Sequence, residues 1–377
     1  MTVGQAVEGA KKATQSGARI VSVDALRGFD MFWIVGADHL VRGLKDVSDA
    51  GWASAFAKQL KHVSWEGFVF YDLIFPLFVF LVGMSIVFSL SKHLDTDSRM
   101  TAYKRILRRF ALLFLLGMFY DQGLSNLAHE SPFSGVLQRL AWCYLFGSLL
   151  YVHLKLRGLI AAFLLIVVGY WALLTFVPKP GREDVSFDKH ENICNYIDLK
   201  YLPMKEEGQR YDPEGLLSTV PAVASCLLGV FAGMFLRNKT YDDKKKVGYL
   251  IGCGIAMVVL GYLWGLQLPI IKRLWTSSYV IVAGGYCCVL MGLFYLVIDV
   301  WKLRKWAIPF IWIGANPLTI YLAEELVGSK NIGVRLVGGP IAEAFGKYGE
   351  LVISAAGILA AIMFVRFLYK RQIFLRV

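Results

Sequence analysis

The 377-residue sequence has only six cysteines, and no two of them have the spacing of a metal site. Five lie in apolar runs, Cys194 stands alone in a polar stretch, and no C-x-x-C pair occurs. Structural zinc sites need closely spaced cysteines or histidines, and small secreted domains need many cysteines for disulfide bonds. The sequence therefore predicts no metal cofactor and no disulfide scaffold.

The beginning of the sequence lacks the apolar core of a signal peptide. The first 24 residues are polar and include Lys11, Lys12 and Arg19. A low-complexity segment, a flexible linker and an internal repeat are also lacking. We expect a cytoplasmic N-terminal segment, 1–24, followed by one transmembrane domain, 25–377, whose first span serves as the targeting signal.

Apolar residues, by contrast, are abundant and come in long runs. Hydrophobic residues make up 56% of the chain and aromatic residues 14%, and the mean hydropathy is +0.53. A soluble domain cannot bury so much apolar surface, and runs of about 20 apolar residues match the thickness of a bilayer. The sequence predicts an all-α polytopic integral membrane protein with about ten transmembrane helices. Their approximate limits are 25–43, 67–91, 103–121, 136–154, 157–177, 215–236, 246–265, 278–298, 306–326 and 350–371.

The formal charge of +12 reflects basic residues in short loops between the predicted spans. Lys and Arg gather in cytoplasmic loops of membrane proteins, so this charge indicates orientation and does not indicate nucleic-acid binding. An N-terminus inside the cell places the basic loops in the cytoplasm. It places two loops outside the cytoplasm. One is the stretch at about 121–135, which has no Lys or Arg, and the other is a long loop at about 178–214. Both termini are then cytoplasmic.

Ionisable residues occur inside the first predicted span. Each costs about 2.5–3.5 kcal/mol at the bilayer centre, so such side chains usually face a cavity or a partner. Arg27 and Asp38 are eleven positions apart, and Asp30 lies between them. On one straight helix Arg27 and Asp38 share a face and are about 16 Å apart along the axis. This pattern predicts a polar track, and salt bridges within the helix bundle are the alternative.

Further polar residues fall at the outer ends of other predicted spans. His62 and Asp72 flank the start of the second span, and His62 is the best general-base candidate because a free imidazole titrates near neutral pH. Taken singly, each residue fits interface anchoring, helix capping or a kink. Together they predict a polar cavity that opens outward. The remaining members of this set are Gln138, Arg139, Asp212, Glu214, Asn316 and Glu324.

Several sequence words, in order along the chain, carry a resemblance to a known family. They are SVDALRG at 22–28, HVSWEG at 62–67, DLIFP at 72–76, FVF at 78–80, VLQRL at 136–140, DPEGLL at 212–217, KRLWTSSYV at 272–280 and GANP at 314–317. In these words the chain resembles the heparan-α-glucosaminide N-acetyltransferase family. The resemblance implies a transmembrane enzyme that takes acetyl-CoA from the cytoplasm and acetylates a glucosamine amine on the far side.

The resemblance also assigns residues. The active histidine of the family corresponds to His62, and a family asparagine corresponds to Asp38, which can carry a charge that asparagine cannot. Lysosomal members have a lumenal domain and a leading helix that are missing here. The chain thus resembles a compact member in a bacterial cytoplasmic membrane, whose acceptor need not be heparan sulfate. An amino-sugar transporter with the same cavity is the rival interpretation.

These interpretations lead to one set of expected roles. His62 acts as general base or accepts the acetyl group itself, and Asp38 or Asp72 orients its imidazole. Arg27 neutralises a phosphate of acetyl-CoA, and Asn316 or Arg139 contacts the thioester and its oxyanion. The expected partners are acetyl-CoA, an amino-sugar acceptor and the lipid bilayer, and a homodimer is left open. The expected sugar contacts are Trp65, Gln138, Asp212, Glu214 and Glu324.

Overall fold

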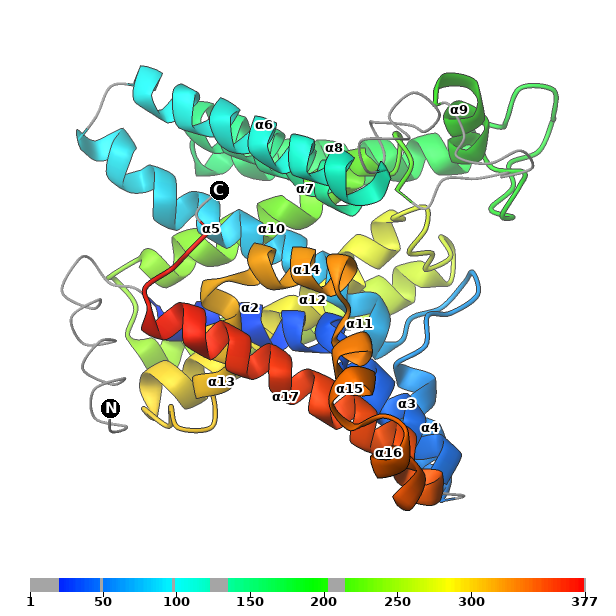
Figure 1. Ribbon diagram of the computed structural model, residues 1–377. Helices are drawn as coiled ribbons and strands as arrows, with labels where there is room; N and C mark the ends of the chain where they lie inside the picture. Colours follow the sequence, from blue (N-terminus) through cyan, green and yellow to red (C-terminus); the bar gives the residue numbers. More distant parts are fainter. Residues whose placement is uncertain (1–19, 48–49, 97–98, 123–134, 203–213, 376–377) are drawn as a thin grey trace.

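Every regular element in the described part of the chain is helical, as the composition predicts (Figure 1). The computed structural model describes residues 20–47, 50–96, 99–122, 135–202 and 214–375. In chain order the elements are α2 (Val21–Phe32), η1 (Trp33–Ala37), α3 (Asp38–Val47), α4 (Gly51–Gln59), η2 (Phe70–Leu73), α5 (Ile74–Thr96), α6 (Arg99–Gln122), α7 (Val136–His153), α8 (Leu156–Phe176), α9 (Ile193–Tyr201), α10 (Thr219–Arg237), α11 (Asp243–Gly265), α12 (Ser277–Phe294), η3 (Tyr295–Val300), α13 (Ile308–Ala315), α14 (Pro317–Leu326), α15 (Ser329–Val337), α16 (Pro340–Ala344), η4 (Gly346–Tyr348) and α17 (Gly349–Lys370).

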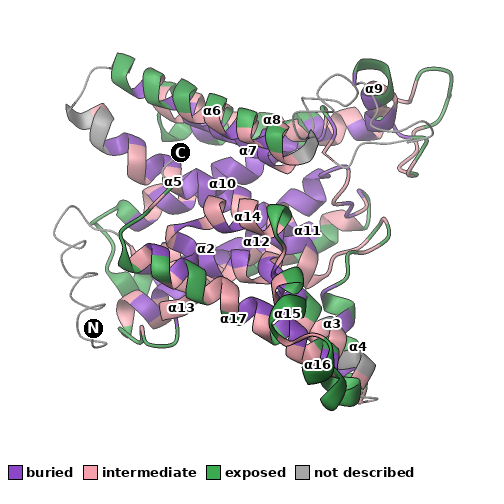
Figure 2. Ribbon diagram, viewed as in Figure 1, coloured by how far each residue is buried: buried purple, intermediate pink, exposed green. Residues whose placement is uncertain are grey.

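The long helices form layers, as Figure 1 shows. Helices α6, α7 and α8 lie on one side, and α2, α13 and α17 lie on the other. Between them run α5, α10 and α12, whose spans are more buried than those of α8, α11 and α17 (Figure 2). The closest pairings are α11 with α12, α10 with α5, α13 with α2 and α15 with α17. Helices α8 and α11 bury little of their surface, so their apolar side chains are available to lipid.

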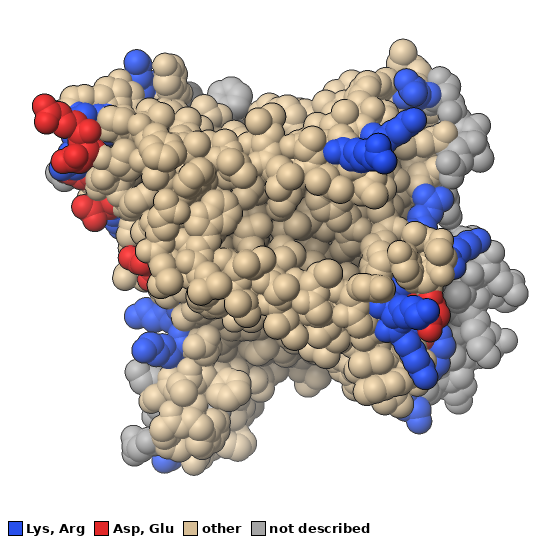
Figure 3. All heavy atoms as spheres, turned by 180° about the vertical axis from the view of Figure 1, so that it is seen from behind, with Lys and Arg blue, Asp and Glu red and all other residues tan. Residues whose placement is uncertain are grey.

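Six of the described helices are long and apolar enough to cross a membrane. They are Phe70–Ser91, Leu156–Phe176, Thr219–Arg237, Asp243–Gly265, Ser277–Val300 and Gly346–Lys370. Figure 3 shows charged side chains at two opposite edges of the molecule with a broad uncharged band between them. This arrangement suits a multi-pass membrane protein. The other four predicted spans are also helical, but they lie outside this set, so the number ten and the cytoplasmic termini stay predictions.

The first predicted span is not one straight helix. At η1 the backbone leaves the helical region, with φ −79° and ψ 15° at Val35 and φ +111° and ψ 1° at Gly36. A positive φ is accessible to glycine because it has no Cβ. Arg27 and Asp38 therefore do not lie on one straight helix. The prediction that they share one polar face of a continuous helix is wrong. The kink instead separates α2 from α3.

Two glycines allow α5 and α10 to touch through their backbones. A Cβ on Gly83 would lie 2.0 Å from the carbonyl oxygen of Cys226, and a Cβ on Gly229 would lie 1.9 Å from that of Phe80. Small residues at such crossings are how helices in membranes approach closely. Because α5 follows directly from η2, this contact also holds the segment that carries Asp72.

We expect Gly229→Ala to lower the thermal unfolding temperature in detergent, because the added methyl group must push α5 away from α10. Overpacking of this kind costs about 1–3 kcal/mol. Gly252→Ala on α11 is the matched control, since nothing lies within 4 Å of a Cβ there and alanine favours helix. Equal unfolding temperatures for the two variants would contradict the close contact between α5 and α10.

Candidate active site

His62 lies in an irregular loop between α4 and η2, and backbone and side-chain contacts fix this loop. Gly67, with φ +120°, donates its backbone N–H to the carbonyl of Ile270 at 2.9 Å. The indole Nε1 of Trp65 donates to the carbonyl of Phe187 at 2.8 Å. The loop is thus attached to the segment before α12 and to the loop before α9. These anchors hold the His62 ring in a defined place, with 41% of its side chain exposed.

Asp72 is the buried partner of His62. Its Oδ1 lies 2.7 Å from His62 Nδ1 and 3.5 Å from Lys272 Nζ, and its side chain is only 1% exposed. Its Oδ2 accepts the backbone N–H of Val69 at 3.3 Å, and its carbonyl accepts the hydroxyl of Tyr279 at 2.7 Å. A carboxylate beside Nδ1 favours the tautomer with the proton on Nδ1, which leaves Nε2 as the basic nitrogen.

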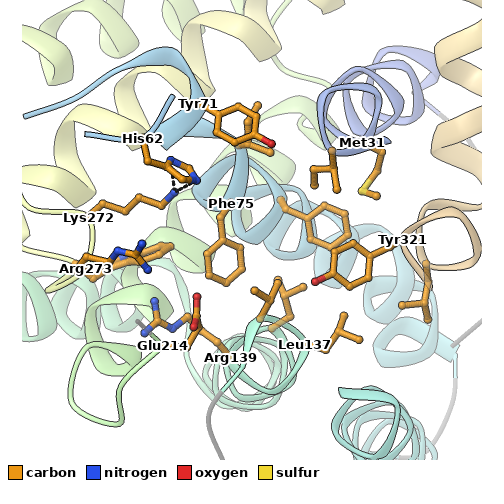
Figure 4. A pocket seen from close by; sticks show the side chains of 17 residues that line it. Met31, His62, Tyr71, Phe75, Leu137, Arg139, Glu214, Lys272, Arg273 and Tyr321 are labelled. Carbon is orange, nitrogen blue, oxygen red and sulfur yellow. Dashed lines mark hydrogen bonds between the residues drawn. The ribbon is translucent and has the colours of Figure 1, made fainter. Parts of the chain in front are cut away.

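Lys272 completes the cluster from the loop between α11 and α12. Its Nζ lies 3.2 Å from Nδ1 and 3.4 Å from Nε2 of His62 (Figure 4). Burial lowers the pKa of Lys272 to about 8 because it disfavours the ammonium form, Asp72 acts in the opposite direction, and Arg273 lowers the pKa further. Lys272 therefore changes its charge close to physiological pH, whereas an ordinary lysine does not.

Asp38 reaches the cluster through Tyr71. The ring centroids of Tyr71 and His62 are 4.7 Å apart, and the Tyr71 hydroxyl donates to Oδ2 of Asp38 at 3.2 Å. Asp38 is buried, with 3% exposure, at the start of α3. Two carboxylates thus act on the imidazole, Asp72 directly and Asp38 by holding the aromatic ring packed against it. Of the two expected orienting residues, Asp72 contacts His62 and Asp38 contacts its neighbour Tyr71.

A cavity of about 210 Å³ extends from this cluster between the helix layers. Figure 4 shows the charged side chains, from His62 to Arg139, on one side and Met31, Leu137 and Tyr321 on the other, with Phe75 between them. The histidine and the charged residues of the described lining are His62, Arg139, Glu214, Lys272 and Arg273. The apolar side includes Met31, Ile34, Phe78, Leu137, Leu318 and Tyr321, contributed by α2, η1, α5, α7 and α14.

Arg139 brings a buried positive charge to this cavity. It is 2% exposed, and one guanidinium nitrogen donates to Ser218 Oγ at 2.6 Å and to the carbonyl of Gly215 at 3.4 Å. The guanidinium also lies 5.0 Å from the ring centre of Trp275. Its Nε is buried and has no hydrogen-bond partner among the described residues. A buried cation with an unused donor favours an anion or a strong acceptor in the cavity.

The structure brings together about half of the residues that the sequence singled out. His62, Arg139 and Glu214 line the cavity, and Asp72 contacts His62. Asp212 lies outside the described residues. A cavity with one polar side is present, and the predicted opening to the outside stays a prediction.

Other candidates have structural contacts away from the cavity lining. Arg27 joins α2 to α5, since it donates to Ser85 Oγ at 2.7 Å. Asn316 holds the C-terminal segment, because its side chain donates to the carbonyl of Ile373 at 3.1 Å and accepts the N–H of Leu375 at 3.3 Å.

The three remaining candidates also stand apart from the lining. Glu324 accepts the backbone N–H and the hydroxyl of Ser329 at 3.1 Å, where α15 begins. Gln138 is fully buried beside Gly117 of α6, and its amide has no hydrogen-bond partner among the described residues. Trp65 is bonded to the carbonyl of Phe187. Glu324 thus fixes a helix end and Trp65 fixes a loop, while Gln138 is packed between α7 and α6.

Lys272, Arg273 and Tyr71 line the cavity and were assigned no role from the sequence. A signal for the first two was present. The predicted topology places the short loop 266–277 outside the cytoplasm, where adjacent basic residues go against the usual charge distribution. Such an exception points to a binding or catalytic role. Tyr71 carried no comparable signal, because an aromatic residue at a span end is a common interface anchor.

Comparison with known proteins identifies the family of the chain. The human heparan-alpha-glucosaminide N-acetyltransferase (Homo sapiens) is 28% identical over 322 residues, which cover 71% of this chain and 48% of the human protein. The mouse protein of the same name (Mus musculus) is 28% identical over 325 residues, which cover 71% and 49%. The chain therefore spans about half the length of the curated relatives it matches. A family model described as heparan-alpha-glucosaminide N-acetyltransferase, catalytic, matches residues 19–262, a range that includes His62, Asp72 and Arg139. The chain belongs to the heparan-alpha-glucosaminide N-acetyltransferase family.

Proposed function

We propose that this protein transfers an acetyl group from acetyl-CoA to the amine of a glucosamine-type sugar. The observation that carries the proposal is the contact of His62 with buried Asp72 and with Lys272 at a cavity wide enough for small reacting groups. A histidine oriented by a carboxylate, next to fixed positive charge, is what acyl transfer to an amine requires. The curated relatives are named for such a transfer.

The step can be written from the residues in contact. His62 Nε2 takes a proton from the sugar ammonium and releases it to solvent, and the neutral amine then attacks the thioester carbonyl. The C–N bond forms, His62 takes the second proton from the attacking nitrogen, and the C–S bond breaks as His62 passes this proton to sulfur, so coenzyme A leaves as a thiol. Asp72 holds the proton on Nδ1 throughout. General-base catalysis of this kind contributes about 10²–10⁴ in rate.

Lys272 and Arg139 supply the positive charge that the oxyanion needs. Both side chains line the cavity and are largely buried, where a charge acts more strongly than in water. Glu214, on the same lining, is placed to accept hydrogen bonds from sugar hydroxyls. In this proposal Arg27 and nearby cytoplasmic loops attract the nucleotide of acetyl-CoA, and the acceptor enters from the opposite side of a bacterial cytoplasmic membrane.

To test the proposal, purified protein in detergent is incubated with radiolabelled acetyl-CoA and glucosamine, and N-acetylglucosamine is measured. We expect product from the unchanged protein and a loss of at least about 100-fold in His62→Ala, because the general base is removed. His190→Ala is the matched control, since His190 is exposed in the loop before α9, away from the cavity lining. We expect it to keep full activity.

The outcomes of this assay separate the two interpretations of the cavity. Undiminished product from His62→Ala would contradict the role of the imidazole. Absence of both product and acetyl-CoA binding in the unchanged protein would contradict the transferase and favour an amino-sugar transporter, which needs no acyl donor.

A second prediction follows from the lowered pKa of Lys272. Below about pH 8 Lys272 is an ammonium ion that neutralises Asp72 and the oxyanion, and above about pH 8 this charge is lost. We therefore expect kcat to fall as the pH rises through about 8, with a dependence on one proton. Lys272→Arg keeps its charge at high pH, so the fall should move to higher pH. An unchanged profile in Lys272→Arg would show that another group titrates.

A further inference from the structure

The cavity has two unlike ends, and the reaction proposed above uses only one of them. The charged side chains among the described lining residues lie on the side of His62 (Figure 4). The other side is formed by aliphatic and aromatic residues of α2, η1, α5, α7 and α14, among them Ile34, Phe78 and Leu318. We call this side the apolar limb. An acetyl methyl group needs far less apolar surface than the apolar limb provides, so the acetyl group does not account for it.

The polar end carries more positive than negative charge. Three cations, Arg139, Lys272 and Arg273, line the cavity. Lys272 is paired with Asp72, and Glu214 is the one carboxylate among the described residues of the lining. Within the described part of the chain, three positive groups thus face two negative ones. With His62 neutral before it takes a proton, one positive charge remains, which one negative charge on a ligand would neutralise.

Two guanidinium groups are the source of this surplus. Arg139 forms no ion pair with a described residue, and its buried Nε has no hydrogen-bond partner among them. Arg273 forms neither a hydrogen bond nor an ion pair with any described residue. Guanidinium groups bind phosphate oxygens through two parallel hydrogen bonds. A phosphodiester, with a single negative charge, matches the surplus in both charge and donor chemistry.

We propose that the acceptor is an amino sugar joined through a phosphodiester to a long alkyl or prenyl chain. Its amine would meet His62, its phosphate would lie against Arg273, and its chain would lie in the apolar limb. Arg139, which has more than one donor, would be shared between the phosphate and the oxyanion. In such a molecule the amine and the phosphate sit on neighbouring ring carbons, so both reach the same end of the cavity. This inference rests on the proposed acetyl transfer and names the acceptor of that same site.

The apolar limb suits a hydrocarbon chain better than the pantetheine arm of coenzyme A. Pantetheine carries two amides, whose buried N–H and C=O groups need hydrogen-bond partners. The apolar limb offers mainly carbon surface, and Tyr321, stacked 4.7 Å from Tyr120, supplies one hydroxyl. A chain of methylene groups needs no partner and gains about 0.8 kcal/mol for each buried CH₂.

The test compares four acceptors in detergent, each with radiolabelled acetyl-CoA. They are glucosamine, glucosamine 1-phosphate, neutral decyl glucosaminide and the decyl phosphodiester of glucosamine. We expect kcat/KM for the decyl phosphodiester to exceed that of each of the other three by at least about ten-fold. Arg273→Gln should reduce the ratio of kcat/KM for the decyl phosphodiester to kcat/KM for decyl glucosaminide. Leu318→Trp, which fills the apolar limb, should reduce the ratio of kcat/KM for the decyl phosphodiester to kcat/KM for glucosamine 1-phosphate.

A matched control variant is Leu326→Trp. Leu326 lies on the same helix as Leu318 and is 68% exposed, so its substitution should leave both kcat/KM ratios unchanged. Glucosamine acetylated as efficiently as the decyl phosphodiester would overturn the inference while supporting the proposed function. Decanoyl-CoA used more efficiently than acetyl-CoA, and sensitive to Leu318→Trp, would assign the apolar limb to the donor and also overturn it.

The binding of the decyl phosphodiester is measured separately, as the shift in thermal unfolding temperature without acetyl-CoA. We expect a rise with the decyl phosphodiester that is smaller in Arg273→Gln and in Leu318→Trp. Binding without any acetyl transfer would contradict the proposed function and support the ligand class. No rise with the decyl phosphodiester, alongside measurable acetylation of glucosamine, would contradict the ligand class alone.

Discussion

The carboxylate of Asp72 is the interaction on which the site depends. It contacts His62 and Lys272 with one oxygen and accepts a backbone N–H of its own turn with the other. It therefore joins three parts of the chain: the loop after α4, the turn η2 at the start of α5, and the loop before α12. A buried carboxylate with 1% exposure persists as an ion only with such partners. Loss of Lys272 would leave this buried carboxylate without its neighbouring positive charge.

The fold places this cluster at the ends of α5 and α12, two of the central helices. α5 contacts α10 through Gly83 and Gly229, and Tyr279 of α12 holds the backbone of Asp72 at 2.7 Å. The cavity then opens between this centre and the helices on either side, α7 on one and α2 and α14 on the other. Rigid central helices fix the reacting groups, and the surrounding helices shape the space for ligands.

The kink at Gly36 belongs to the same arrangement. Met31 and Ile34, just before it, line the cavity, and Asp38, just after it, accepts a hydrogen bond from Tyr71. In a straight first helix, the position of Asp38 would be fixed by the direction of α2. The break lets one segment supply both an apolar wall and a buried carboxylate to the site.

Sequence patterns predicted the class of fold and the centre of the site, because both depend on local features. Long apolar runs predict helices in a membrane, and His62 and Asp72 are ten residues apart at one span end. Contacts between residues that are far apart in the sequence were not predictable in this way. Lys272 meets His62 across 210 positions, and no periodicity reports a contact at that separation.

The kink in the first predicted span was also not predictable from the sequence. The turn at Gly36 depends on a single positive φ, which composition does not reveal. Asn316, Glu324 and Gln138 were singled out because polar groups are costly in membranes. In the structure Asn316 and Glu324 satisfy backbone groups near the cavity, and Gln138 is buried beside Gly117. Polarity at bilayer depth indicates importance without distinguishing a ligand contact from a structural one.

The most direct measurement is a cryo-electron microscopy structure of the protein with a non-hydrolysable thioether analogue of acetyl-CoA. The account predicts the analogue's carbonyl carbon in the cavity, close enough to His62 for an amine to lie between them, with the reacting atoms about 3–3.5 Å apart. It also predicts the carbonyl oxygen facing Lys272 and Arg139. A bound analogue whose carbonyl lies outside this cavity, with His62, Asp72 and Lys272 still in mutual contact, would contradict the central claim.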